Sequence, residues 1–367
     1  MKSTILISVD SLRLDYLDEM PKTTKFFDAT YTNAFATYPS TIGSFPSIIG
    51  GVYPVSVGLE KTNSVVPNIE HSQKLGVTTN VLTSGKYGYD AGFTHFNSMT
   101  ENESITTKLG RKIPDGRVYS ILNSSLQTAR KVSRKFTAKE TNSNREYPRA
   151  REVIDTIKQT IDKERNFFVW AHFMDVHHPY HSEKYSTVSR NDAYQLTKQV
   201  LGKNGGTKSE KKQTKNLYED CVRQLDDDLS NLYSWAPDDT RIVFCADHGE
   251  HLGEKDHWGH HEYLDNVLLN VPFLTRNISK IQSNVISLID IPSILLGNSY
   301  NNGTLQRDYA YSMCDEKKSV TDGTNMLTNE DTVDDHTLQT KLNNFNPERA
   351  VRQAQANTDD LEALGYL

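Results

Sequence analysis

Four short runs of mainly apolar residues, rich in β-branched side chains, are separated by longer polar or helical stretches. They lie at Ile5–Val9, Val77–Leu82, Phe167–His172 and Arg241–Ala246. Continuous apolar runs of this length are typical of strands that are buried on both faces of a parallel sheet. Glu152–Lys163 and Leu217–Trp235 instead repeat apolar residues every three or four positions, which predicts amphipathic helices.

The alternation of these strands and helices predicts an α/β fold, with a mixed, mostly parallel central sheet and helices on both faces. We expect one main domain over residues 1–298 and a small C-terminal subdomain over residues 299–367, where the sequence becomes polar and rich in turn residues. Ligands bind beyond the carboxyl ends of the strands in such sheets. Polar residues that directly follow the apolar runs are therefore the first candidates for a functional site.

The composition argues against several classes of protein. The 367 residues include 47 acidic and 41 basic side chains, and a net charge of −6 argues against general nucleic-acid binding. No apolar run approaches the roughly 20 residues that span a bilayer, and the first ten residues lack the apolar region of a signal peptide. Three widely spaced cysteines predict neither disulfides nor a cysteine zinc site. We therefore expect a cytoplasmic protein without a transmembrane segment.

Two segments carry a local excess of positive charge. Residues 108–151 hold 12 Lys and Arg against three Asp and Glu, and residues 198–215 hold six Lys and one Glu. One interpretation is an ordinary solvated helix and loop. The alternative is a basic wall that draws an anionic substrate or an anionic surface toward the functional site.

Nine of the 12 histidines fall in two short windows, residues 172–181 and 248–261. Asp247 follows the apolar run at residues 241–246, and His248, the first residue of the second window, comes next. A carboxylate and an imidazole are therefore adjacent in the sequence. That pairing suits a hard or borderline divalent cation. Asp10, which follows the first apolar run, adds a second carboxylate if the two strands are neighbours. The pattern predicts a metal site at the strand ends.

Residues 38–54 form a hydroxyl-rich turn that leads into a short apolar helix. A hydroxyl at the start of a helix lies near the positive end of the helix dipole, and a bound cation lowers its pKa further. From this chemistry alone, Ser40, Thr41 and Ser44 are equal candidates for a nucleophile. The alternative is that they are the N-cap residues of an ordinary helix.

Several short motifs follow one another along the chain. They are Ile5–Leu17, Gly76–Phe96, Asp175-Val176-His177-His178-Pro179-Tyr180, Asp247-His248-Gly249-Glu250, Trp258-Gly259-His260 and the ending Leu361–Leu367. In this order they resemble the sulfatase branch of the alkaline phosphatase superfamily. The resemblance covers most of the chain and implies a metal-dependent ester hydrolase with an alkaline-phosphatase-like fold.

The resemblance places the nucleophile at Thr41, because in family members this residue precedes the glycine of a Gly-x-Tyr-Pro element by ten residues. That element is Gly51-Val52-Tyr53-Pro54 in this chain. Sulfatases proper have Cys or Ser at the nucleophile position, followed by x-Pro-x-Arg, and convert it to formylglycine. Thr41-Ile42-Gly43-Ser44-Phe45 lacks the Cys, the Pro and the Arg. We therefore do not expect formylglycine.

A threonine nucleophile favours phosphate esters over sulfate esters. A formylglycine hydrate releases sulfate by cleaving its own C–O bond, whereas a threonine sulfate would need attack at sulfur. A phosphothreonine intermediate is hydrolysed by attack at phosphorus.

The resemblance also implies a role for each candidate residue. A divalent cation (Ca, Mg, Mn or Zn, in one or two sites) would be held by Asp10, Thr41, Asp247 and His248. His177 and His260 would hold the remaining oxygens of the substrate or protonate the leaving group. Asp175 would orient His177 or help to hold a second cation. Arg13 and Glu250 would hold these residues in place without contacting the cation or the substrate themselves.

The predicted function is therefore a metal-dependent hydrolase of anionic esters, most consistent with phosphate mono- or diesters. The substrate would be an anionic small-molecule or saccharide ester. The alternatives are sulfate ester hydrolysis with Thr41, a phosphoryl or phosphoglycerol transferase, and a catalytically inactive relative that binds sugars or phosphate.

Overall fold

The computed structural model describes residues 2–54, 58–99, 147–202, 205–297, 306–331 and 335–347. Apart from Tyr147, these residues belong to one compact unit. Most of the basic segment predicted at residues 108–151, and the motif at residues 361–367, lie outside the described residues.

A seven-stranded sheet forms the centre of this unit, in the order β2-β10-β7-β1-β6-β4-β5. Strand β10 runs antiparallel to both of its neighbours, β7 and β2, whereas the pairings among the other strands are parallel. The strands are β1 (Thr4–Val9), β2 (Ala29–Tyr31), β4 (Gln73–Thr78), β5 (His95–Ser98), β6 (Phe167–Phe173), β7 (Arg241–Ala246) and β10 (Phe273–Arg276). The predicted mixed, mostly parallel sheet is confirmed.

The most apolar runs occupy the middle of the sheet, as their lack of polar alternation predicts. Every residue of β1 and of β6 is buried, because helices cover both faces of these strands. The second predicted strand is the exception, since β4 ends at Thr78 and residues 81–83 form a turn of 3₁₀ helix. The Asn80 side chain accepts a hydrogen bond from the Leu82 amide at 2.9 Å and so caps this turn.

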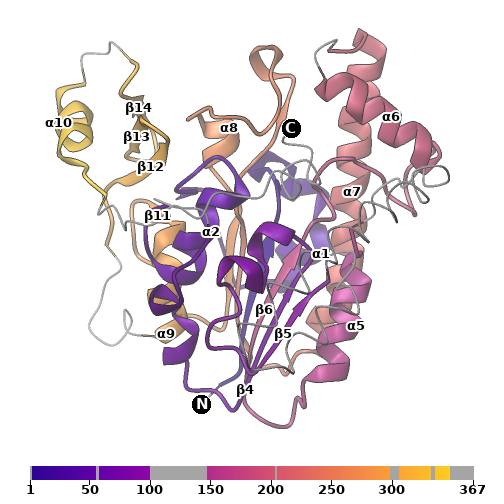
Figure 1. Cartoon of the computed structure of the whole chain (residues 1–367), viewed down its shortest axis with the longest axis vertical. Helices are drawn as coiled ribbons and strands as arrows, with labels where there is room; N and C mark the ends of the chain where they lie inside the picture. The colour runs from indigo at the N-terminus through magenta and orange to yellow at the C-terminus, as the bar shows by residue number, and fades with distance from the viewer. Residues whose placement is uncertain are drawn as a thin grey trace, which may run out of the picture. The chain divides into compact units, whose positions relative to one another are not determined.

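Helices cover both faces of the sheet, with α2 and α9 on one side and α5 and α7 on the other (Figure 1). Their bounds are α1 (Pro21–Phe26), α2 (Thr41–Gly50), α5 (Ala150–Thr160), α6 (Arg190–Leu201), α7 (Lys208–Trp235), α8 (Asn266–Leu269), α9 (Ile291–Leu296) and α10 (His336–Asn344). Helix α7 begins nine residues before the predicted Leu217, because Thr207 and Glu210 form a capping box at its N-terminus. Among the described helices, none is long and apolar enough to cross a membrane.

Three smaller sheets surround the central one. Strands β3 (Ala34–Phe35) and β11 (Ile286–Ser287) form one pair, and β8 (His251–Leu252) and β9 (Trp258–Gly259) form another. The third consists of β12 (Ala310–Cys314), β13 (Lys317–Thr321) and β14 (Met326–Thr328).

The third small sheet and helix α10 share a small core made of Val320, Leu327, Leu338 and Leu342. Strand β12 is also joined to the chain that leads into α2, because the Met313 amide donates to the Thr37 carbonyl oxygen at 2.9 Å. Strands β13 and β14 and helix α10 therefore have a core of their own, and they belong to the same compact unit as the central sheet.

Candidate active site

Two buried carboxylates meet at the carboxyl ends of β1 and β7, which are neighbours in the sheet. Asp10 follows β1 directly and Asp247 follows β7, and the Asp247 amide donates to the Val9 carbonyl oxygen at 3.2 Å. One ligand atom each from Asp10, Asp247 and His248 lies within 4.8 Å of the others, and all three residues are fully buried. The structure thus brings three of the four predicted metal ligands together.

Thr41 is the fourth predicted ligand, and it lies against the same group. It is the first residue of α2, after the extended N-cap residue Ser40. Its Oγ1 donates a hydrogen bond to Asp10 Oδ2 at 3.0 Å and lies 3.2 Å from His248 Nε2. The Ser44 hydroxyl instead donates to the Tyr38 carbonyl oxygen at 2.7 Å. Of the three hydroxyls that the sequence left equal, only Thr41 contacts the carboxylate group.

Close backbone packing fixes the loop that carries His248. The Gly249 amide donates to the Leu268 carbonyl oxygen of α8 at 2.8 Å. A Cβ atom at Gly249 would overlap the Val267 carbonyl oxygen, so this position requires glycine. The His248 ring is oriented by its own neighbour, because Nδ1 donates to the Gly249 carbonyl oxygen at 2.8 Å and leaves Nε2 toward Thr41.

Ser11, Asn80 and His172 also contact Asp10 and were not predicted. Asn80 donates from Nδ2 to Asp10 Oδ2 at 3.0 Å, and His172 Nε2 lies 3.4 Å from the same oxygen. His172 lies near the end of β6, which pairs with β1, and Asn80 lies just beyond the end of β4, the next strand along the sheet. The rule that selected Asp10 and Asp247, a polar residue after a buried strand, missed Asn80 because the predicted strand Val77–Leu82 included it, whereas β4 ends at Thr78.

The charges of this group fit a divalent cation. Burial raises the pKa of Asp10, but His177, His172 and His248 outweigh that effect and hold the pKa well below its usual range. Burial and the adjacent charge of Asp10 raise the pKa of Asp247 well above its usual range. Asp247 Oδ2 is buried and has no hydrogen-bond partner among the described residues. A cation between the two carboxylates would remove their repulsion and give this oxygen a partner.

A second group of possible ligands consists of three imidazoles beside the first group. His177, His178 and His260 each offer one atom within 4.8 Å of the others. The His260 ring centre lies 4.4 Å from that of His248 and 5.3 Å from that of His177. The structure therefore places the predicted His177 and His260 next to the metal-ligand group.

Glu250 orients His260 from a fully buried position. His260 Nδ1 donates to Glu250 Oε1 at 3.0 Å, and the Tyr180 hydroxyl donates to Oε2 at 2.8 Å. Burial raises the pKa of Glu250, but His260 and His178 outweigh this and hold it well below its usual range, so the carboxyl is charged. Arg13 Nη1 donates to the Glu250 carbonyl oxygen at 3.1 Å. Of the two residues that were predicted to support the site, Glu250 contacts His260 and Arg13 contacts Glu250.

His177 is held in its neutral form. Burial lowers the pKa of His177 to about 3, and His178 adds to this effect. Its Nδ1 donates to the His178 carbonyl oxygen at 2.6 Å, which fixes the tautomer with the lone pair on Nε2. In this state His177 can accept a hydrogen bond or ligate a cation, but it has no proton to give from Nε2.

Asp175 lies apart from the metal-ligand group. Its Oδ1 accepts a hydrogen bond from the amide of Ala150, the first residue of α5, at 3.0 Å. Neither group of possible metal ligands among the described residues includes Asp175. The structure thus places this carboxylate at a helix N-terminus rather than beside His177.

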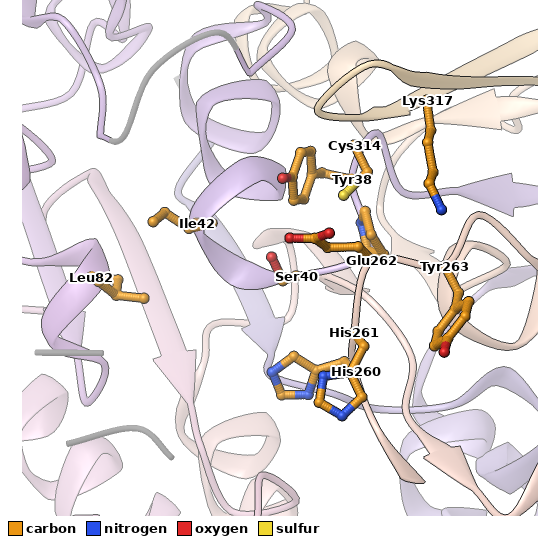
Figure 2. A pocket seen from close by; sticks show the side chains of 11 residues that line it. Tyr38, Ser40, Ile42, Leu82, His260, His261, Glu262, Tyr263, Cys314 and Lys317 are labelled. Carbon is orange, nitrogen blue, oxygen red and sulfur yellow. The ribbon is translucent and has the colours of Figure 1, made fainter. Parts of the chain in front are cut away.

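A cavity of about 490 Å³ opens beside the first turn of α2. It is lined by Tyr38, Pro39, Ser40, Ile42, Leu82, His260, His261, Glu262, Tyr263, Cys314 and Lys317 (Figure 2). Its walls come from α2 and the chain before it, the loop after β9, and the β12–β13 hairpin. Since Ser40 precedes Thr41 and His260 contacts His248, the cavity is adjacent to the carboxylates and is large enough for a small organic ligand.

Solved structures with the same fold include several enzymes. The phosphonate monoester hydrolase SpPMH from Silicibacter pomeroyi is 13% identical, with a TM-score of 0.57 over 89% of this chain and 88% of that chain. BT4656, solved in complex with its substrate D-glucosamine-2-N,6-O-disulfate, is 12% identical, with a TM-score of 0.60 over 89% and 88%. The C-terminal periplasmic domain of EcEptC from Escherichia coli, in complex with Zn, is 14% identical, with a TM-score of 0.52 over 83% and 84%. No curated protein sequence matches the chain.

The family model for sulfatases matches residues 2–297. This range includes all strands of the central sheet, Thr41, and both histidine windows. It therefore covers both groups of possible metal ligands, whereas Cys314 and Lys317 of the cavity wall lie beyond it. The chain belongs to the sulfatase family and is an ester hydrolase of the sulfatase-like type.

Proposed function

We propose that this protein is a metal-dependent hydrolase of phosphate esters in which Thr41 is the nucleophile. The observation that carries the proposal is the position of Thr41 Oγ1, which contacts both Asp10 and His248 at the N-terminus of α2. A buried hydroxyl that lies among candidate metal ligands, and near the positive end of a helix dipole, is set for deprotonation.

The residues that would hold the cation are Asp10, Asp247 and His248, with Thr41 Oγ1 beside them. Bound there, a divalent cation would lower the pKa of the Thr41 hydroxyl and offset the negative charge of a substrate oxygen. Two carboxylate oxygens, an imidazole nitrogen and a hydroxyl form a donor set that suits Mg, Mn, Ca or Zn.

The proposed reaction has two steps. Deprotonated Thr41 Oγ1 forms a bond to phosphorus while the bond from phosphorus to the ester oxygen breaks, and that oxygen takes a proton from His260 Nε2. Water then attacks the phosphothreonine and gives a proton to His260 as the bond to Thr41 Oγ1 breaks. His260 suits this role because Glu250 Oε1 accepts from its Nδ1 and so orients the ring, whereas His177 is held neutral.

The choice of phosphate over sulfate rests on the second step. Thr41 lacks the second oxygen of a formylglycine hydrate, so a covalent intermediate can be released only by attack on the transferred group. Phosphorus accepts such an attack from water, and a threonine sulfate offers no easier route. Sulfate ester hydrolysis by the same residues is the alternative that the experiment below measures directly.

The test compares 4-nitrophenyl phosphate and 4-nitrophenyl sulfate as substrates of the metal-loaded protein. We expect turnover of the phosphate ester, and a loss of about 10³-fold or more in kcat for Thr41→Ala. Acid quenching of the reaction followed by mass spectrometry is expected to find phosphate on the peptide that contains Thr41. A change in product ratio on addition of an alcohol would reveal a transferase.

Ser44→Ala is the matched control, since Ser44 carries a hydroxyl on the same helix but donates to Tyr38. We expect this variant to keep the turnover of the wild type. Undiminished turnover in Thr41→Ala would refute the nucleophile assignment. Faster hydrolysis of the sulfate ester would refute the substrate assignment and leave Thr41 as a sulfatase nucleophile.

A further inference from the structure

The cavity beside Thr41 presents two side chains of opposite charge that do not pair with each other. Glu262 belongs to the loop after β9, and Lys317 is the first residue of β13. Figure 2 shows the Glu262 carboxylate in the middle of the lining, near Ser40 and Tyr38, and the Lys317 ammonium reaching in from the hairpin above. No ion pair joins Glu262 to Lys317 in the part of the chain that the structure describes, so each charge is able to meet a ligand.

The two charges differ in how they are balanced by the protein. Lys317 Nζ lies 3.3 Å from Glu330 Oε2, and the two side chains are 37% and 60% exposed. An ion pair this open to water contributes little, so a ligand carboxylate can take the place of Glu330. Glu262 has no ion-pair partner among the described residues and is exposed, so its carboxylate at the cavity wall is open to a ligand.

Aromatic rings flank these charges. The Tyr38 ring packs on the first turn of α2, where a Cβ atom at Gly43 would overlap it. The Tyr263 ring is stacked on the ring of His257, with their centres 4.1 Å apart. Because neighbouring residues hold both rings, they offer flat apolar surface to the body of a ligand while Glu262 and Lys317 supply the polar contacts.

We propose that the leaving group of the substrate is an alcohol or phenol that carries both a protonated amine and a carboxylate. This inference rests on the proposed function, because it places the ester at Thr41 and the released alcohol in the cavity. The amine binds Glu262, the carboxylate binds Lys317, and the carbon skeleton packs between the two tyrosine rings. A neutral alcohol would make no ionic contact with either residue, and an alcohol with one charge would use one residue and be repelled by the other.

The experiment uses four aryl phosphate monoesters whose leaving groups are phenols that carry different charges. They are phenyl phosphate, 4-carboxyphenyl phosphate, 4-(aminomethyl)phenyl phosphate and O-phospho-L-tyrosine. With the metal-loaded wild type, we expect kcat/KM for O-phospho-L-tyrosine to exceed that for phenyl phosphate by about tenfold or more, which corresponds to one well-formed charged contact. The two singly charged esters should show no such gain.

Single substitutions assign the two contacts. In Glu262→Gln, the ratio of kcat/KM for O-phospho-L-tyrosine to that for 4-carboxyphenyl phosphate should fall to about one. In Lys317→Met, the ratio of O-phospho-L-tyrosine to 4-(aminomethyl)phenyl phosphate should fall in the same way. Glu316→Gln is the matched control, because Glu316 is an exposed acid of the same hairpin that does not line the cavity, and it should keep the wild-type ratios.

The outcomes separate this inference from the proposed function. Equal kcat/KM values for all four esters, with turnover that requires Thr41, would overturn the inference and leave the proposed function standing. If no ester is turned over, the proposed function fails. Calorimetric titration of L-tyrosine into the metal-loaded protein then decides the inference alone: binding that Glu262→Gln and Lys317→Met both abolish supports it, and absence of binding to the wild type overturns it.

Discussion

Ser40, Thr41 and Ser44 lie within five residues and carry the same functional group, but their surroundings differ. Thr41 Oγ1 meets Asp10 and His248, the Ser44 hydroxyl donates to a backbone carbonyl oxygen, and Ser40 lines the cavity. Each step along a helix turns the side chain by about 100°, so the rotation of α2 about its axis decides which hydroxyl faces the carboxylates. Residue type alone could not make that choice.

Asp175 is a residue whose charge affects the stability of the fold as a function of pH. Burial raises its pKa in the folded protein to about 6, whereas an Asp in an unfolded chain loses its proton near pH 4. Between these values the folded state holds a proton that the unfolded state releases. The free energy of unfolding therefore falls as the pH rises from about 4 to about 6, by about 3 kcal/mol.

The variant Asp175→Asn tests this contribution, because its amide cannot titrate and its oxygen can still accept from the Ala150 amide. The difference in unfolding free energy between the variant and the wild type should grow in favour of the variant from pH 4 to pH 7. Urea denaturation at both pH values measures it. A difference that stays constant with pH would show that Asp175 does not titrate in this window.

At the scale of elements, the predicted strand bounds are right where the whole strand is buried and wrong where a polar side chain ends the strand by capping a turn. Three of the four predicted strands match the structure within one residue, because an apolar run in the middle of a sheet has no other way to be buried. The strand predicted at Val77–Leu82 is shifted because Asn80 caps a turn, and a single polar side chain in an apolar run does not reveal this.

Helix α2 depends on a close contact that a small substitution can break. In Gly43→Ala, the added methyl group would overlap the Tyr38 ring, so we expect a loss of about 1–3 kcal/mol in stability and a displaced Thr41. Denaturant unfolding gives the stability, and turnover of 4-nitrophenyl phosphate reports on Thr41. A smaller side chain in Tyr38→Leu/Gly43→Ala should restore most of the stability. A single variant as stable and active as the wild type would contradict the packing argument.

At the scale of the molecule, the parallel neighbours β7, β1, β6 and β4 bring polar residues from distant parts of the sequence to one edge. This part of the site could be predicted, since Asp10, Asp247 and His248 directly follow buried strands. The buried series of hydrogen bonds that joins Tyr180, Glu250 and His260 could not be predicted in this way, because these contacts depend on how loops fold over the sheet edge. The place of Asp175 at the start of α5 depends in the same way on the packing of that helix.

Removal of the cation should be visible in the stability of the whole protein. Without it, the buried carboxylates of Asp10 and Asp247 repel each other, and the binding free energy of the ion is lost from the folded state. We expect a chelator to lower the Tm by about 5 °C, and Ca, Mg, Mn or Zn to restore it according to affinity.

Asp247→Asn removes one of the two charges, so its Tm should respond little to the chelator. The ion that restores the wild-type Tm at the lowest concentration identifies the preferred metal. An unchanged Tm in the wild type after complete removal of metal, checked by elemental analysis, would contradict a cation site between these residues.

The β12–β13 hairpin supplies Cys314 and Lys317 to the cavity, yet it lies beyond residue 297, where the match to the sulfatase family ends. The residues of the proposed reaction therefore belong to the shared family region, and part of the cavity wall belongs to a stretch outside it. Substitutions in this hairpin can change which substrates bind without altering the residues that break the ester bond. The proposed chemistry at Thr41 and the choice of substrate can therefore change independently of each other.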